Sequence, residues 1–354
     1  MITIDGSQGE GGGQILRTAV SCGGMLGEAV RIKNIRANRS KPGLKRQHLT
    51  AVRAVAEICG AKLEGAELNS SELVFEPGAP RGGNYHFAIG SAGSVTLVAQ
   101  TIIPVLLMAP EASNVVIEGG THVQGAPIFE FFDEVYLPQL RRMGCDVSAT
   151  LERHGFFPAG GGRIRLAIKP LKTPSTPISL KDAGNLRSVE IVALYSVVDR
   201  RIPQAEAELI ASKLEDFHPS ISVREVDAIC PGNAVYAKLA YDNITEIFSA
   251  IGAVDVSRKA VAEKVVKRVK DYLKVGQPVG QLLADQLLLP ILRFGKSGAG
   301  AFRTCAPSQH FKTNLDVLRA FDNSFETCAT ELQNGGIEFA ISKANNNANN
   351  NNNA

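Results

Sequence analysis

The stretch Gln281–Leu292 reads QLLADQLLLPIL, and a related apolar stretch, SVTLVAQTIIPVLLM, fills residues 94–108. Apolar residues dominate both stretches, which predicts two buried helices. Gln286 and Gln100 each stand four residues before a proline. A shared pattern of this kind predicts a repeated strand-and-helix unit of ~70–90 residues, longer than the usual solenoid periods.

A shorter echo supports the repeat, because GQIL at 13–16 resembles GQLL at 280–283. The glycine loop GEGGG at 9–13 comes directly before a predicted helix that contains GQIL. Such a loop lets an anion approach the backbone N–H groups of a helix N-terminus. It matches neither GxGxxG nor a Walker loop, so the standard nucleotide motifs do not apply. Glu10, inside the loop, is either a ligand for a divalent cation on a polyphosphate or a solvated glutamate.

Residues from about Gly184 to Lys274 interrupt the repeat. The pattern predicts strands and one helix, followed by a long helix whose valines fall every four residues opposite lysines and arginines. The predicted elements are strands at Val189–Val198, Ser220–Val226 and Ala234–Ala240 and a helix at Ala205–Leu214. A self-contained set of elements between two pieces of a larger domain indicates an inserted domain.

Positive charge is concentrated between Ala29 and Ala56, a segment without any acidic residue. Its cations are Arg31, Lys33, Arg36, Arg39, Lys41, Lys45, Arg46 and Arg53. Forked guanidinium groups commonly bind phosphate, which makes this segment a candidate phosphate site. The alternative is a solvated basic face.

The bulk composition is that of a globular protein. The chain has 354 residues, 44% of them hydrophobic, and a formal net charge of +3, too small an excess for a general nucleic-acid coat. Six scattered cysteines without a CxxC pair favour a reducing compartment. The first residues resemble no secretory signal, and the longest apolar run, Ile102–Ala109, is too short to span a bilayer. We therefore expect a cytoplasmic protein that does not enter a membrane.

Among the six histidines, His310 has the most suggestive context. No HxxxH or HExxH pair exists, so the spacing offers no histidine-built metal motif, and no GxSxG elbow indicates a hydrolase. His310 follows the strand-like Ala301–Thr304 and precedes an amphipathic helix, a position that presents an imidazole at the rim of a sheet. Imidazole is a competent nucleophile near neutral pH. The string His154–Ile164, HGFFPAGGGRI, requires tight backbone turns.

These motifs together resemble the RNA 3′-terminal phosphate cyclase family. The strings that carry the resemblance are EGGGQILR at 10–17, IRA at 35–37, KPGL at 41–44, RQHL at 46–49, SAGS at 91–94, HGFFPAGGGRI at 154–164, LADQL at 283–287 and His310. The resemblance covers the chain from Ile2 to about Ser342.

The resemblance implies an α/β (α+β) fold: a large domain of three repeated β/α units, each a four-stranded sheet with two helices, and a smaller α/β insert. Applied to this chain, it places units 1 and 2 and the start of unit 3 in residues 1–183. The insert occupies 184–276, the remainder of unit 3 occupies 277–342, and an Asn-rich tail at 343–354 is expected to be disordered.

The resemblance also implies a three-step reaction. A histidine attacks the α-phosphorus of ATP to form histidyl-AMP, AMP passes to an RNA 3′-terminal phosphate, and the vicinal 2′-OH closes a 2′,3′-cyclic phosphate with release of AMP. His310 corresponds to that histidine, and Glu10 would bind Mg²⁺ or Mn²⁺. Arg17, Arg36, Arg39, Gln47 and His48 would hold the RNA end and phosphates. Gln100, Leu282, Leu283, Ala284, Asp285 and Gln286 fall where the family binds adenosine, although some members carry tyrosine at the position of Leu282.

Two alternatives remain open. A branch of the family lacks the nucleophilic histidine and acts as a binding factor in ribosome assembly, and enolpyruvyl-type transferases share the repeated β/α architecture. His310, the three arginines and the string at 154–164 favour the cyclase. The expected partner is RNA with a 3′-terminal phosphate, and no obligate protein partner is visible from the sequence.

Overall fold

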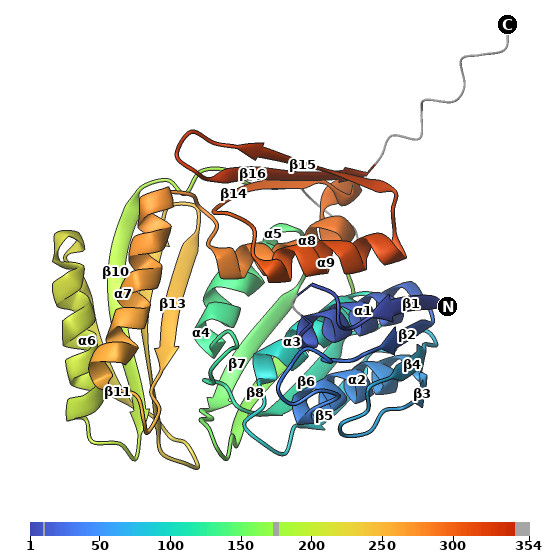
Figure 1. The fold of residues 1–354 in the computed structure, drawn as a ribbon, viewed down its shortest axis with the longest axis horizontal. Coiled ribbons are helices and arrows are strands. Elements are labelled where there is room, and N and C mark those ends of the chain that lie inside the picture. Colours follow the sequence, from blue (N-terminus) through green and yellow to red (C-terminus); the bar gives the residue numbers. More distant parts are fainter. Residues whose placement is uncertain (10, 173–176, 344–354) are drawn as a thin grey trace, which may run out of the picture.

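The computed structural model describes residues 1–9, 11–172 and 177–343. Within this part of the chain, four four-stranded sheets surround or flank a set of packed helices (Figure 1). Glu10 and the Asn-rich tail from residue 344 onward lie outside the described residues. No helix in the described ranges has both the length and the apolar character that a bilayer crossing requires.

Three of the sheets belong to three units with the same order of elements. The first unit contains β1 (Ile2–Asp5), α1 (Gly13–Leu26), β2 (Val30–Lys33), α2 (Arg46–Cys59), β3 (Lys62–Glu64) and β4 (Leu73–Glu76). The second contains β5 (Gly83–Ala88), α3 (Val95–Leu107), β6 (Ser113–Gly119), a helix made of α4 (Phe129–Phe131), the π-helical turn η1 (Phe132–Tyr136) and α5 (Leu137–Arg142), then β7 (Val147–Arg153) and β8 (Gly162–Ile168). The third contains β9 (Ile178–Leu180), α8 (Gln281–Phe294), the 3₁₀ turn η3 (Lys296–Gly298), β14 (Gly300–Thr304), α9 (Gln309–Phe321), β15 (Phe325–Glu331) and β16 (Ile337–Lys343).

The three sheets also share one topology. Their strand orders are β1-β2-β4-β3, β5-β6-β8-β7 and β9-β14-β16-β15. In each sheet the first two strands pair in parallel and the remaining pairs are antiparallel. A parallel pair requires a crossover, which α1, α3 and α8 provide in the first two units and at the end of the longer connection in the third. The predicted threefold repeat is confirmed.

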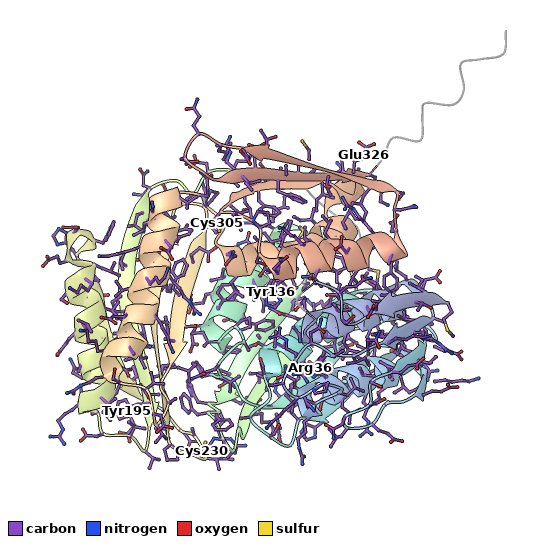
Figure 2. The ribbon with its side chains drawn as sticks, in the orientation of Figure 1. Arg36, Tyr136, Tyr195, Cys230, Cys305 and Glu326 are labelled. Atoms are coloured by element: carbon purple, nitrogen blue, oxygen red, sulfur yellow. The ribbon has the colours of Figure 1, made fainter. Side chains whose placement is uncertain are left out.

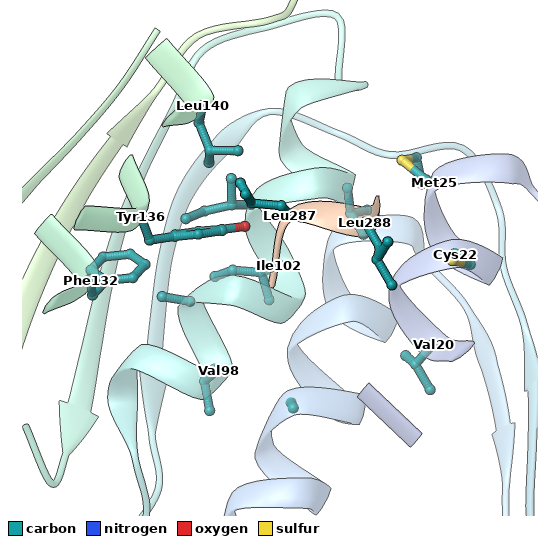
Figure 3. Packing of buried hydrophobic residues seen from close by; sticks show 14 of the residues in the cluster. Val20, Cys22, Met25, Val98, Ile102, Phe132, Tyr136, Leu140, Leu287 and Leu288 are labelled. Carbon is teal, nitrogen blue, oxygen red and sulfur yellow. The ribbon is translucent and has the colours of Figure 1, made fainter. Parts of the chain in front are cut away.

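The helices of the three units pack against one another in one core. Helix α1 contacts α2, α3 and α9, and α8 contacts α9. Figure 3 shows Ile102 of α3, Tyr136 of η1 and Leu287 of α8 close together in this core, with Val20 of α1 on the other side of the same cluster. The helices α3 and α8, in each of which a glutamine stands four residues before a proline, are called the glutamine–proline helices below. They are thus central elements of the fold, as their apolar sequences predict.

The interruption forms a fourth sheet of different order, β11-β10-β12-β13, covered by two helices on one face (Figure 1). Its elements are β10 (Leu186–Ser196), α6 (Arg201–Lys213), the 3₁₀ turn η2 (Glu215–Phe217), β11 (Ser220–Glu225), β12 (Gly232–Tyr241), β13 (Thr245–Ile251) and α7 (Arg258–Val275). They stand in the chain between β9 and α8. We refer to them below as the insert; the domain boundaries at 184 and 276 stay a prediction.

Alternation along β10 divides the insert sheet between two cores. Ile191 and Ala193 pack in a separate cluster with α6 and α7, whereas Val192 and Leu194 belong to the main core. Successive side chains of a strand point to opposite faces of its sheet. One face of the insert sheet therefore packs against α6 and α7, and the other face packs against the three-unit body.

Some element boundaries differ from the sequence-based predictions. Strand β2 ends at Lys33, because Asn34 and Arg36 have φ of 53° and 55°. Helix α6 begins at Arg201 rather than Ala205, where Asp199 Oδ1 accepts a hydrogen bond from the backbone N–H of Arg201 at 2.9 Å. β13 was not predicted, and its buried Glu246 interrupts the apolar pattern that identifies strands.

Candidate functional site

His310 lies in the first turn of α9, at the point where the chain leaves β14. Ser308 caps this helix, since its Oγ accepts from the backbone N–H of Phe311 at 2.9 Å. The same hydroxyl donates to Asp285 Oδ1 of α8 at 2.5 Å, which fixes the start of α9 against α8. The imidazole of His310 is exposed and lines a cavity of about 750 Å³. The strand-to-helix turn predicted around His310 is therefore present.

The cavity beside His310 lies between the third unit and the insert, and residues 123–126 of the second unit also line it. Leu282 and Asp285 of α8 form one wall, and Cys305, labelled in Figure 2, lies on the turn before α9. The opposite wall consists of 246–251 in β13 and of α7 residues that include Lys264 and Arg268. The sequence-based prediction missed this wall entirely. The sequence did show that the amphipathic helix α7 has a basic face. It did not indicate which part of the protein that face lies opposite.

The two repeated glutamines meet next to the cavity. Gln100 Nε2 of α3 donates to Gln286 Oε1 of α8 at 2.5 Å. Both line a smaller space of about 50 Å³ that also contacts Arg17 and Asp285. Because Asp285 lines both spaces, it links the glutamine pair to the cavity of His310.

Leu282, Leu283 and Ala284 differ in their exposure. Leu282 is 43% exposed and faces the large cavity, whereas Leu283 and Ala284 are buried in the core at 0% and 2%. Of these three side chains, only that of Leu282 therefore opens onto the cavity. The part of Leu283 and Ala284 in nucleotide binding stays a prediction that would have to rest on their backbone.

Arg17 and His48 approach one another at the N-terminus of α1. Arg17 Nη2 donates to Gln14 Oε1 at 2.5 Å, and His48 is 6% exposed in the first turn of α2. Burial, and then the charges of Arg17, Arg36 and Lys45, lower the pKa of His48 to about 3. His48 is consequently neutral at pH 7. Its Nδ1 accepts from the backbone N–H of Lys45 at 3.3 Å, so Nε2 carries the proton and is the donor available to a ligand.

Arg36 and Arg39 lie on the turn that follows β2. Arg36, labelled in Figure 2, donates from Nη1 to the carbonyls of Lys41 at 2.6 Å and Gly43 at 3.0 Å, and thereby shapes this turn. Burial and the neighbouring charge of Arg39 lower the pKa of Arg36. Two like-charged guanidinium groups held together in this way favour an anion between them.

Three other cations of the basic stretch have protein partners. Arg31 pairs with Glu72 at 3.4 Å, Lys45 Nζ donates to Asn69 Oδ1 at 2.7 Å, and Arg53 Nη2 donates to a backbone carbonyl at 3.2 Å. Gln47 Oε1 accepts from the backbone N–H of Ser94 at 3.0 Å, which joins α2 to the start of α3. Arg31, Lys45 and Arg53 thus take part in structural contacts, as Arg36 does on its turn.

The predicted metal ligand, Glu10, lies outside the described residues, so no ligand set is assigned around it. A different group brings metal-ligand types together: one ligand atom each of His122, Glu130 and His154 lies within 4.8 Å of the others. His122 Nε2 lies 2.7 Å from Glu130 Oε2, and its Nδ1 lies 2.8 Å from Thr121 Oγ1. The sequence offered no metal motif here because these residues come from separate elements.

This histidine–glutamate group lies at the contact of the second unit with the insert. The backbone N–H of His154 donates to the carbonyl of Asp227 at 3.2 Å. Burial lowers the pKa of His154 to about 4. The fully buried His122 is hydrogen-bonded through both nitrogens, and these contacts join it to Thr121 and Glu130.

Comparison with known proteins gives two findings. A family model described as RNA 3′-terminal phosphate cyclase matches residues 8–326. Among solved structures, the enolpyruvyl transferase NikO from Streptomyces tendae matches 60% of this chain at 14% identity with a TM-score of 0.27. That match covers 38% of the NikO chain, so this protein spans well under two thirds of its length.

Proposed function

Because the chain belongs to the RNA 3′-terminal phosphate cyclase family, we propose that it converts an RNA 3′-terminal phosphate into a 2′,3′-cyclic phosphate with consumption of ATP. The observation that carries the proposal is the position of His310. Its exposed imidazole stands on a capped helix turn, in the wall of a cavity large enough for a nucleotide. The reaction is an AMP- and diphosphate-forming ligation.

In the first step a nitrogen lone pair of the His310 imidazole attacks the α-phosphorus of ATP, and the bond to the β-phosphate oxygen breaks. Pyrophosphate leaves, and AMP remains on the imidazole through a P–N bond. The Ser308–Asp285 hydrogen bond supports this step, because it holds the turn bearing His310 against the helix that would contact the nucleoside. Leu282 would contact the adenine, with Gln100 and Gln286 alongside.

In the second step an oxygen of the RNA 3′-terminal phosphate attacks the phosphorus of the AMP on His310. The P–N bond breaks, and the His310 imidazole is the leaving group. In the third step the oxygen of the terminal 2′-OH attacks the 3′-phosphorus, and the bond to AMP breaks. AMP leaves, the hydroxyl proton passes to solvent, and the cyclic diester is closed. Arg17, Arg36 and Arg39 would neutralise the phosphates, and His48 Nε2–H and Gln47 would donate to the terminal nucleotide. A divalent cation, when bound, would neutralise charge on the ATP phosphates.

Incubation with α-labelled ATP and Mg²⁺ or Mn²⁺, followed by denaturing electrophoresis, tests the mechanism. We expect acid-labile label on the wild type and none on His310→Ala. His86→Ala is the matched control, because His86 is an exposed histidine of β5 that lines neither space and should keep the label. A wild type that acquires no label would refute the proposal and favour a binding factor without catalysis.

The RNA end is tested separately. A 3′-phosphorylated oligonucleotide should become cyclised, whereas a 3′-hydroxyl or a 2′-deoxy terminus should give no cyclic product, because the cyclic diester needs both the phosphate and the 2′-OH. Cyclisation without a 2′-OH would contradict the third step.

A further inference from the structure

The wall that the insert contributes to the cavity of His310 combines cations with aromatic rings. We propose that this wall, made of α7 and β13, binds the single-stranded RNA that precedes the terminal phosphate, with Lys264 and Arg268 on its phosphates and Phe248 and Tyr272 against its bases. This inference rests on the proposed function and extends it from the reacting nucleotide to the strand behind it.

The two cations lie on one face of α7. Lys264 and Arg268 are four residues apart, so they are neighbours on the helix surface, and both line the cavity. Arg268 Nη1 donates to the carbonyl of Ser249 at 2.7 Å, which holds the guanidinium against β13. Within the described ranges neither side chain forms an ion pair with a carboxylate. Their charges are therefore available to a phosphate.

The acidic groups of the same cavity are occupied by other contacts. Asp271 pairs with Lys267 at 2.8 Å, and Asp285 accepts from Ser308 at 2.5 Å. Glu246 accepts from the backbone N–H of Gly280 at 2.6 Å, and its burial raises the pKa of its carboxyl to about 8, so it is mostly uncharged at pH 7. The balance of charge facing the cavity from α7 and β13 is consequently positive.

Two rings stand beside the cations. Phe248 and Tyr272 line the cavity with centroids 5.1 Å apart and planes inclined at 47°, and both are half-buried. The Tyr272 hydroxyl donates to the carbonyl of Pro278 at 3.1 Å, which fixes the ring. Proteins that bind single-stranded nucleic acids commonly combine cations along the phosphate backbone with aromatic rings on which the bases stack.

The chemistry of His310 explains why RNA should reach this wall. The RNA phosphate must attack the adenylate on His310, so the strand has to enter the cavity that His310 lines. The predicted nucleoside contacts, Leu282 and Asp285, come from the other wall, formed by α8. A strand leaving the reacting end can then follow α7 and β13, which face α8 across the same space.

The test compares two double variants that each lose two positive charges from α7. Lys264→Ser/Arg268→Gln alters the cavity wall, and Lys270→Ser/Lys274→Gln alters exposed residues that do not line the cavity. The dissociation constant of a 3′-phosphorylated RNA octanucleotide should rise at least tenfold in the first variant only. Its dependence on log salt should flatten by about 1.4, because each phosphate contact on a single strand contributes about 0.7. A nucleoside 3′-monophosphate, which has no preceding strand, should bind to both variants alike.

A measurement with ATP distinguishes whether Lys264 and Arg268 bind the RNA phosphates or the ATP phosphates. The Michaelis constant for ATP in labelling of His310 should be the same in both variants. An increase of that constant in the cavity variant, with unchanged RNA affinity, would mean that the pair holds the ATP phosphates and would overturn the inference. Equal loss of RNA affinity in both variants would also overturn it. RNA binding does not require adenylation of His310. A protein that never acquires label would therefore refute the proposed function, but the RNA dissociation constants of the two variants could still be compared.

Discussion

At the scale of single residues, Gly13 sets how closely two phosphate-binding candidates can approach α1. It is the first residue of that helix, and a Cβ there would collide with His48 Nε2 and lie 3.0 Å from Arg17 Nη1. Because Gly13 has no side chain, the neutral imidazole of His48 and the guanidinium of Arg17 can lie together at the N-terminus of α1. Such a place favours an anion, because the backbone N–H groups and the helix dipole add to the side chains.

We expect Gly13→Ala to lower the free energy of unfolding by about 1–3 kcal/mol, as overpacking of a filled site does. RNA cyclisation should slow at least tenfold, because His48 and Arg17 are displaced. In a double-mutant cycle by urea denaturation, Gly13→Ala should cost less than 1 kcal/mol in the His48→Ala background, since the colliding ring is gone. The same cost in both backgrounds would show that the collision is not the cause.

At the scale of elements, one carboxyl joins the insert to the third unit. Glu246 of β13 is 1% exposed, and it accepts from the backbone N–H of Gly280, the residue that caps α8. Burial raises its pKa to about 8 from a usual value near 4.5. The native state therefore keeps a proton that the unfolded chain releases. Stability from this group is complete below pH 4.5 and is lost as the pH rises toward 8.

Glu246→Gln should remove this pH dependence, because an amide oxygen can still accept from Gly280 and does not ionise. The difference in unfolding free energy, variant minus wild type, should grow by about 1.4 kcal/mol per pH unit between pH 5 and 8. Urea unfolding at several pH values measures it. Glu190→Gln is the control, as a partly exposed glutamate of β10. A difference that stays constant with pH would mean that Glu246 is ionised in the native state.

Glu246 also illustrates what the sequence leaves undetermined. The glutamine–proline helices and the turn before His310 were predictable, because apolar runs and a strand-to-helix junction are local signals. The direct bond between Gln100 and Gln286 agrees with their equivalent places in the repeat. β13 and the cavity wall on α7 were not predictable, since a buried glutamate disguises the strand and an amphipathic helix does not reveal what its polar face meets.

At the scale of the whole molecule, the insert sheet is shared between two cores. Val192 of β10 is 1% exposed in the main core, and Val189 on the same strand is 4% exposed in the cluster with α6 and α7. The cavity of His310 lies along the junction between this sheet and the three-unit body. Packing through the Val192 face therefore holds the two walls of the site together, whereas packing through the Val189 face holds only the insert.

Val192→Ala and Val189→Ala make a matched pair for this arrangement. Each removes the same two methyl groups from a buried site and should cost on the order of 1–3 kcal/mol. Hydrogen exchange followed by mass spectrometry should show faster exchange in β10, β12 and the helix 129–142 of the second unit for Val192→Ala. For Val189→Ala, faster exchange should be confined to β10, β12, α6 and α7, because local opening spreads through the elements that share a core. Identical exchange patterns in the two variants would contradict a division of the sheet between two cores and would make the insert and the three-unit body one cooperative unit.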